Sequence, residues 1–138
     1  MYAVVRISTL HPVFLPTSTG GHFKGCQPSV SVELLRDAWV PGVQTLYLGK
    51  AAVGRTGRRG LRKRLDEYRR YGQGQPIGHQ GGRYIWQLAD AAHLLVAWLP
   101  TPDDDPGEIE AKLIAEFKRV AGTRPFANRN VGRRLPPS

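Results

Sequence analysis

The sequence predicts a small α+β domain, α/β in the broad sense, with a mixed, largely antiparallel sheet of three to four strands flanked by helices. Three observations support this fold class. Short apolar segments recur along the chain, two longer segments have helical periodicity, and the apolar segments alternate with the helical ones. With 138 residues and 41% hydrophobic residues, the chain can bury one core, so we expect a single domain over residues 1–138.

The strands are predicted from β-branched and apolar runs bounded by turn residues. These runs lie at residues 2–7, 43–49, 83–88 and 93–99. Residues 9–29 are rich in Pro, Gly, Ser and Thr without any period, which predicts a long loop. Residues 72–82 contain repeated glycines and predict a second loop.

Two of the helices are predicted from local signals. Residues 31–39 form one or two turns that end before Pro41 and Gly42. Residues 58–70 form an amphipathic helix, because apolar side chains recur at steps of four and three. The buried positions of this second helix are Leu61, Leu65 and Tyr68.

The last helix, at residues 103–122, has a well-marked start and end. Asp105 suits the N-cap, Pro106 suits the first helical position, and Glu108 completes a capping-box spacing. Gly122 suits the C-terminal end. We expect a buried stripe made of Ile109, Leu113, Ile114, Phe117 and Val120.

Composition narrows the class of protein. The formal net charge is +9, which makes an anionic partner expected, nucleic acid before membrane. The single cysteine, Cys26, excludes an internal disulfide, and no apolar run is long enough to cross a bilayer. The N-terminal apolar stretch is too short for a signal peptide. We therefore expect a cytoplasmic protein with no membrane partner and a frayed basic, Pro-rich tail at about residues 130–138.

Positive charge is concentrated at residues 55–70, where eight basic and two acidic side chains leave six net charges. Few acids stand four residues from these arginines, and unpaired arginines suit bidentate contacts with phosphate. The alternative is an ordinary solvated face. The nucleic-acid-binding candidates are Lys50, Arg55, Arg58, Arg59, Arg62, Lys63, Arg69 and Arg70.

Several other chemistries have little support. The glycines between residues 49 and 60 lack the phosphate-loop pattern, which excludes a nucleotide site of that kind. His22 and Cys26 have no second ligand pair, which disfavours zinc. Cys26 lacks the local sequence of a nucleophile. His79 lies in a glycine-rich loop after the basic helix, so it is a weaker site candidate.

Glu110 is the acid that the spacing singles out. It precedes Leu113, Ile114 and Phe117 by three, four and seven residues, which places its carboxylate on the buried side of the helix. A partly buried carboxylate is costly unless it is paired or bound to a metal. Glu110 therefore either binds a metal ion or pairs with a nearby arginine.

Four segments, in order along the chain, resemble motifs of the GIY-YIG nuclease family. LYLGKA (46–51) resembles its second tyrosine motif, LRKRLDEY (61–68) its arginine helix, EAKLIAEF (110–117) its glutamate helix, and PFAN (125–128) its asparagine ending. MYAVVRI at the start fits the first strand, which makes residues 9–42 an enlarged insertion. The resemblance assigns a catalytic set of Tyr2, Tyr47, Arg64, Tyr68, Glu110 and Asn128.

The resemblance implies a divalent-metal-dependent endonuclease that hydrolyses phosphodiester bonds, with DNA favoured over RNA as substrate. Glu110 would hold Mg²⁺ or Mn²⁺, and Mg²⁺ needs few carboxylates because it keeps several waters. Arg64 would bind the scissile phosphate, and Tyr47 or Tyr2 would relay a proton. Tyr68 would assist by hydrogen bonding, and Asn128 would steady the site.

Two alternatives remain open. One is a catalytically silent nucleic-acid-binding module on the same fold, and the other is a basic protein-interaction domain. No targeting domain is visible, so substrate choice would come from a partner or from the loops at 9–42 and 72–82.

Overall fold

The computed structural model describes residues 1–51, 60–77, 82–101 and 103–129. The predicted tail at 130–138 lies outside these residues, as do Arg55, Arg58, Arg59 and His79. Within the described part, no helix combines the length and apolar character that crossing a bilayer requires.

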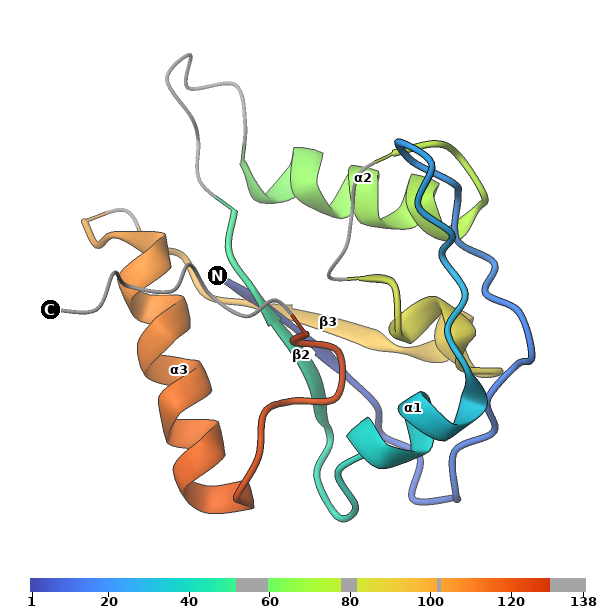
Figure 1. Cartoon of the computed structure of the whole chain (residues 1–138). Coiled ribbons are helices and arrows are strands. Elements are labelled where there is room, and N and C mark those ends of the chain that lie inside the picture. The colour runs from blue at the N-terminus through green and yellow to red at the C-terminus, as the bar shows by residue number, and fades with distance from the viewer. Residues whose placement is uncertain (52–59, 78–81, 102, 130–138) are drawn as a thin grey trace, which may run out of the picture.

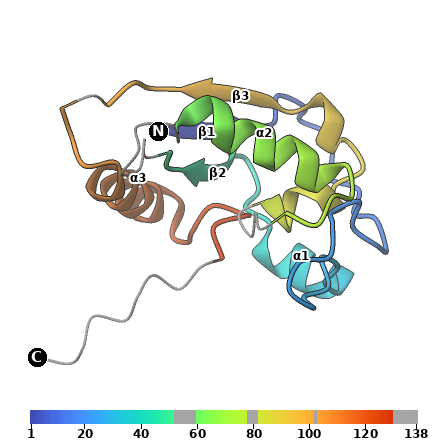
Figure 2. The ribbon, with the colours of Figure 1, turned by 90° about the horizontal axis from the view of Figure 1, so that it is seen from above.

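The centre of the fold is a three-stranded antiparallel sheet with the order β2-β1-β3. The strands are β1 (Tyr2–Val5), β2 (Thr45–Gly49) and β3 (Leu95–Trp98). This confirms the predicted α+β class and the antiparallel sheet. The sheet runs between the helices α2 (Leu61–Gly72) and α3 (Pro106–Ala121), and α1 (Val32–Ala38) lies at the end of the molecule away from α3 (Figure 1). Figure 2 shows the same layers from above.

The predicted strand at 83–88 is wrong. Ile85–Gln87 forms one turn of 3₁₀ helix, closed by a hydrogen bond from the Leu88 N–H to the Ile85 carbonyl at 3.0 Å. The carboxamide of Gln87 is buried and bonds to Leu15 and Val30 of the long loop, at 2.8–3.0 Å. These distant partners satisfy the segment without a neighbouring strand.

The first two helices agree with their local signals. The helices are α1 (Val32–Ala38) and α2 (Leu61–Gly72). Ser31 caps α1 by accepting a hydrogen bond from the Leu34 N–H at 3.3 Å. On α2, Tyr68 is buried and both leucines pack against the core, as predicted.

The third helix, α3 (Pro106–Ala121), begins and ends where predicted. The Asp105 carboxylate accepts from the Gly107 N–H at 2.7 Å, and Gly122 has the left-handed φ of 78°. The predicted buried stripe is wrong, because no residue of α3 is buried: Ile109, Ile114 and Phe117 are half-buried, and Leu113 and Val120 are exposed. The helix packs along β2, and a three-stranded sheet is too narrow to cover its whole apolar face.

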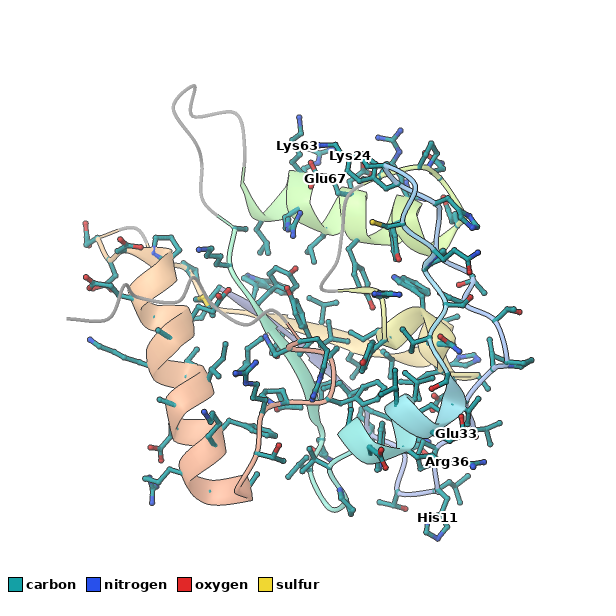
Figure 3. All side chains as sticks on the ribbon, viewed as in Figure 1. His11, Lys24, Glu33, Arg36, Lys63 and Glu67 are labelled. Carbon is teal, nitrogen blue, oxygen red and sulfur yellow. The ribbon has the colours of Figure 1, made fainter. Side chains whose placement is uncertain are left out.

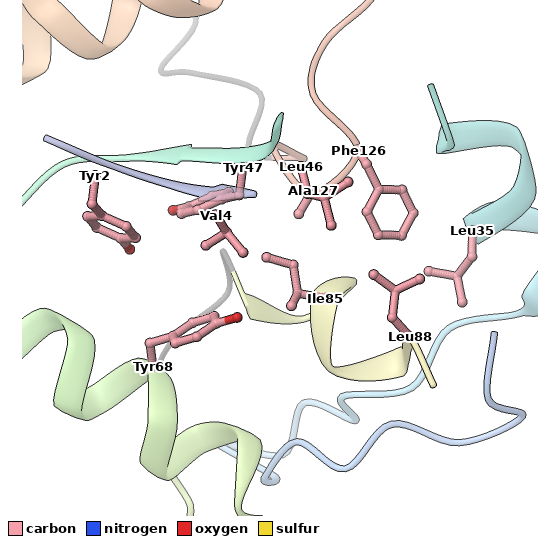
Figure 4. Close-up of a cluster of buried hydrophobic side chains, with 10 residues drawn as sticks. All are labelled: Tyr2, Val4, Leu35, Leu46, Tyr47, Tyr68, Ile85, Leu88, Phe126 and Ala127. Atoms are coloured by element: carbon pink, nitrogen blue, oxygen red, sulfur yellow. The ribbon is translucent and has the colours of Figure 1, made fainter. Parts of the chain in front are cut away.

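The core lies between the sheet, α2 and the loops. Its buried side chains come from β1, β2, α1, α2 and the segments around residues 85–88 and 126–127, as Figure 4 shows. The ring of Phe126 stacks on Phe14 of the long loop at 5.9 Å and meets Trp39 edge-on at 5.2 Å. The predicted loop at 9–29 therefore contributes Phe14 to the core, while most of its other residues are exposed.

Candidate functional site

Two tyrosines meet where β1 and β2 pair. Tyr2 lies opposite Gly49, and Val4 lies opposite Tyr47, so both tyrosines project from the same face of the sheet. Their ring centroids are 5.8 Å apart. A Cβ at Gly49 would come within 2.5 Å of the Tyr2 Cζ, so only glycine leaves room for this ring.

The two phenols have different roles in their shared contact. Burial raises the pKa of Tyr2, and the hydrogen bond to Tyr47 raises it further. Burial also raises the pKa of Tyr47, whereas the same hydrogen bond lowers it. The shared hydrogen bond therefore favours negative charge on Tyr47 more than on Tyr2.

Arg64 reaches both phenols from α2. Its guanidinium acts on Tyr2 and Tyr47 by charge and by hydrogen bonding, and it lowers both pKa values against the effect of burial. Burial works against the charge of Arg64, but the phenols and Glu67 outweigh it, so the pKa of Arg64 is raised. Arg64 therefore keeps its positive charge in a half-buried position.

Glu67 is a residue of this cluster that the sequence did not single out. Its carboxylate accepts a hydrogen bond from Nη1 of Arg64 at 3.1 Å, and its side chain is 14% exposed. The spacing of three residues on one helix is the signal that could have found it. Because one side of the guanidinium is held by Glu67, Arg64 is oriented toward the two phenols.

Glu110 approaches the cluster from α3. Burial raises the pKa of its carboxyl group, while the charge of Lys50, the Lys50 backbone N–H and the charge of Arg64 oppose this increase. The side chain is half-buried, as the spacing on the helix predicted. The structure thus places one carboxylate within the electrostatic reach of Arg64 and Tyr47.

A metal ion here would depend on a single acidic side chain. In the described ranges, no group of three or more His, Cys, Asp or Glu side chains is close enough to hold an ion. One carboxylate fits an ion that keeps most of its water ligands, as Mg²⁺ does, and does not fit zinc. Glu110 is the described residue that suits this role.

Tyr68 and Asn128 lie at the edge of the cluster. Tyr68 is buried beneath Tyr47 (Figure 4), and burial, followed by the charge of Tyr47, raises its pKa. The Asn128 carboxamide accepts from the Leu48 N–H at 2.9 Å and donates to the Leu48 carbonyl at 2.8 Å. It therefore holds the strand that carries Tyr47.

The basic side chains are distributed differently from the prediction. Arg69 and Arg70, expected to be unpaired, both contact Asp66, at 3.0 and 3.8 Å. Asp66 stands three and four residues before them on the same face of α2, which explains the pairing. Arg62 and Lys63 are exposed on α2, and Figure 3 labels Lys63. Lys50 is also exposed, and its charge lowers the pKa of the nearby Glu110 carboxyl group.

Comparisons with known proteins add nothing to this geometry. No protein-family model, curated protein or solved structure matches the chain.

Proposed function

We propose that this protein is a divalent-metal-dependent endonuclease of the GIY-YIG type, acting on nucleic acid and on DNA before RNA. The observation that carries the proposal is the convergence of four side chains from four elements. Tyr2, Tyr47 and Glu110 surround the guanidinium of Arg64, although these residues are far apart in sequence.

Phosphodiester hydrolysis requires an activated water, a neutralised phosphate and a stabilised leaving oxygen. Arg64 supplies a fixed positive charge for the phosphate, and Glu67 holds it in orientation. Glu110 would hold Mg²⁺ or Mn²⁺, which would supply Lewis-acid stabilisation of the phosphate oxygens.

Tyr47 is the better acceptor for the proton of the attacking water. Burial raises the pKa of Tyr47, but the charge of Arg64 and the hydrogen bond shared with Tyr2 both act in the other direction and favour the phenolate. Tyr2 is 2% exposed, and burial and Tyr47 both raise its pKa, so it supports Tyr47 rather than replacing it. Tyr68 packs beneath Tyr47, and Asn128 holds the strand from its edge.

A nicking assay on supercoiled plasmid with Mg²⁺ or Mn²⁺, and with EDTA as the metal-free control, tests the proposal. Arg64→Ala and Glu110→Ala should each lower the rate of nicking by about a hundredfold or more, the effect of removing one preorganised electrostatic group. Circular dichroism should show that both variants remain folded.

Two exposed residues of α3 provide matched controls. Glu116 and Arg119 pair with each other on the solvent face, so Glu116→Ala and Arg119→Ala should nick at the rate of the wild type. Wild-type rates in the Arg64 and Glu110 variants would contradict the proposal.

A catalytically silent nucleic-acid-binding module is the second candidate. The observation that favours it is that, among the described residues, no group of three or more His, Cys, Asp or Glu side chains could hold a metal ion. This module would bind nucleic acid equally well with Glu110 or with alanine at that position, and it would not nick plasmid under any metal condition.

A further inference from the structure

The strand β3 forms an open edge of the sheet. The order β2-β1-β3 gives it one neighbour, β1, and Figure 2 shows β3 at the margin of the ribbon, on the side away from β2. The other edge of the sheet is covered by residues 125–128, which bond to Leu46 and Leu48 of β2. Among the described residues, therefore, β3 is the edge that can still pair with another strand.

The hydrogen bonds to β1 show which backbone groups of β3 point outward. The Leu99 N–H donates to the Met1 carbonyl at 2.9 Å, and the amino group of Met1 donates to the Leu99 carbonyl at 3.2 Å. In an antiparallel ladder, residue pairs that exchange both bonds alternate with pairs that exchange none. Ala97, like Leu99, therefore points its backbone groups toward β1, whereas Val96 and Trp98 point theirs outward.

The exposed side chains of β3 are apolar on both faces of the sheet. Trp98 is 65% exposed on one face, and Leu95 and Leu99 are 52% and 58% exposed on the other. The second face is only partly covered, because α3 packs along β2, two strands away. Residues 94–101 contain no charged side chain, although the chain carries a net charge of +9. Edge strands that stay unpaired are usually protected by charged residues, proline or a bulge, and β3 contains none of these.

We infer that β3 pairs with the same strand of a second copy of this chain, antiparallel and about a twofold axis at Ala97. This inference goes beyond the proposed function and does not depend on it. Val96 would exchange both of its outward hydrogen bonds with Trp98 of the second copy, and Trp98 would do the same with Val96 of the second copy. The two three-stranded sheets would then form one continuous sheet.

The residues at the two ends of the strand determine this register. The Leu94 N–H already donates to a carbonyl of the preceding turn at 3.4 Å, and Pro100 has no N–H. An axis at Val96 would pair Trp98 with Leu94, and an axis at Trp98 would pair Val96 with Pro100. Each of these registers lacks one donor. With the axis at Ala97, every outward donor of the strand has a partner.

The side chains also match in this register. On one face, Leu95 lies opposite Leu99 of the second copy and Ala97 lies opposite itself, and on the other face Val96 lies opposite Trp98. Charge favours a second copy as well, since two chains of the same sign can meet along an uncharged strip without bringing like charges together. Nucleic acid would find no phosphate ligand on this strip.

Sedimentation equilibrium over a series of protein concentrations, in samples freed of nucleic acid, tests the inference. The average mass should rise from that of one chain to that of two, with a dissociation constant on the order of micromolar. Ala97→Lys and Ala97→Glu should each weaken association by about tenfold or more, because two like charges then meet across the axis. An equimolar mixture of the two variants should associate again. Val120→Lys adds the same charge at an exposed position of α3 and should not change association.

Three results would overturn the inference. The first is a chain that stays single at every concentration, and the second is association that neither Ala97 variant weakens. The third is a mixture of the Lys and Glu variants that stays monomeric, because residue 97 would then not face itself. Circular dichroism should show that the variants remain folded, since Ala97 is exposed. The nicking assay keeps the two proposals apart: nicking by a monomer removes only the dimer, whereas a dimer that does not nick removes only the nuclease.

Discussion

Glu110 is a half-buried carboxylate, and different parts of its surroundings shift its pKa in opposite directions. Burial raises its pKa above the usual 4.5, and the positive charges around it only partly offset this effect. The folded protein therefore binds the Glu110 proton more tightly than the unfolded chain does. Protonated Glu110 therefore stabilises the folded state at pH values below the pKa that Glu110 has in the unfolded chain. This contribution is lost as the pH rises through the pKa that Glu110 has in the folded protein.

This residue gives a prediction for the dependence of stability on pH. In EDTA, Glu110→Gln should raise the melting temperature relative to the wild type at pH 7, and the difference should shrink toward pH 4. Thermal unfolding of both proteins across that range measures it. Glu108→Gln is the control, because Glu108 is exposed in the first turn of the same helix and its charge favours the helix dipole. A melting-temperature difference for Glu110→Gln that is constant with pH would contradict the assignment.

At the scale of elements, the free edge of β2 is covered by the segment at residues 125–128. The Ala127 N–H donates to the Leu46 carbonyl at 2.8 Å, and Asn128 satisfies both backbone groups of Leu48. The segment thus takes the place of a fourth strand along an edge that carries Tyr47. An edge closed in this way does not offer its backbone to other chains.

Asn128→Ala should lower the free energy of unfolding by about 1–3 kcal/mol, because it leaves buried backbone groups of Leu48 without partners. Urea denaturation measures this change. Asn128→Asp is the matched variant: it still accepts from the Leu48 N–H but no longer donates to the Leu48 carbonyl. Stability equal to the wild type in Asn128→Ala would show that the contact does not hold the strand.

At the scale of the whole molecule, the net charge of +9 should dominate the approach of nucleic acid. Within the basic helix, Arg69 and Arg70 both pair with Asp66, so their guanidinium groups are less available to phosphate. Arg62 and Lys63 are exposed on the same helix and are the better phosphate ligands there.

If about five phosphates are contacted, the logarithm of the affinity should fall against the logarithm of salt concentration with a slope of about −4. Replacing Arg62 and Lys63 together by alanine should make this slope shallower by about 2, since each contact contributes about one unit. Titrations of oligonucleotide at several salt concentrations measure both slopes, with Arg119→Ala as the control. A flat salt response in the wild type would argue against nucleic acid as the partner.

The parts of the fold that local chemistry controls were predictable. Ser31 and Asp105 mark the starts of α1 and α3, and Gly122 marks the end of α3. Hydrogen bonds within a few residues stabilise these features, so the sequence contains the whole signal. The Asp66 pairs also have helical spacing, and their omission was an error of interpretation rather than a missing signal.

The segment at 83–88 could not be predicted in the same way. Its residues have strand-like composition, but Gln87 bonds to Leu15 and Val30, which lie 72 and 57 residues away in the chain. Side-chain composition cannot show which distant backbone groups will need partners. The exposure of Trp98 was hidden for the same reason, because it depends on which elements cover β3 at the edge of the sheet.

For the candidate site, the sequence by itself determined which residue types were present and that Glu110 lies on the inward side of its helix. Helical periodicity is a local property, so it can be read without the fold. The tertiary structure alone decided that the rings of Tyr2 and Tyr47 meet and that Arg64 lies between the phenols and Glu67. These relations join residues from separate elements, and only the packing of the sheet against α2 and α3 sets their distances and burial.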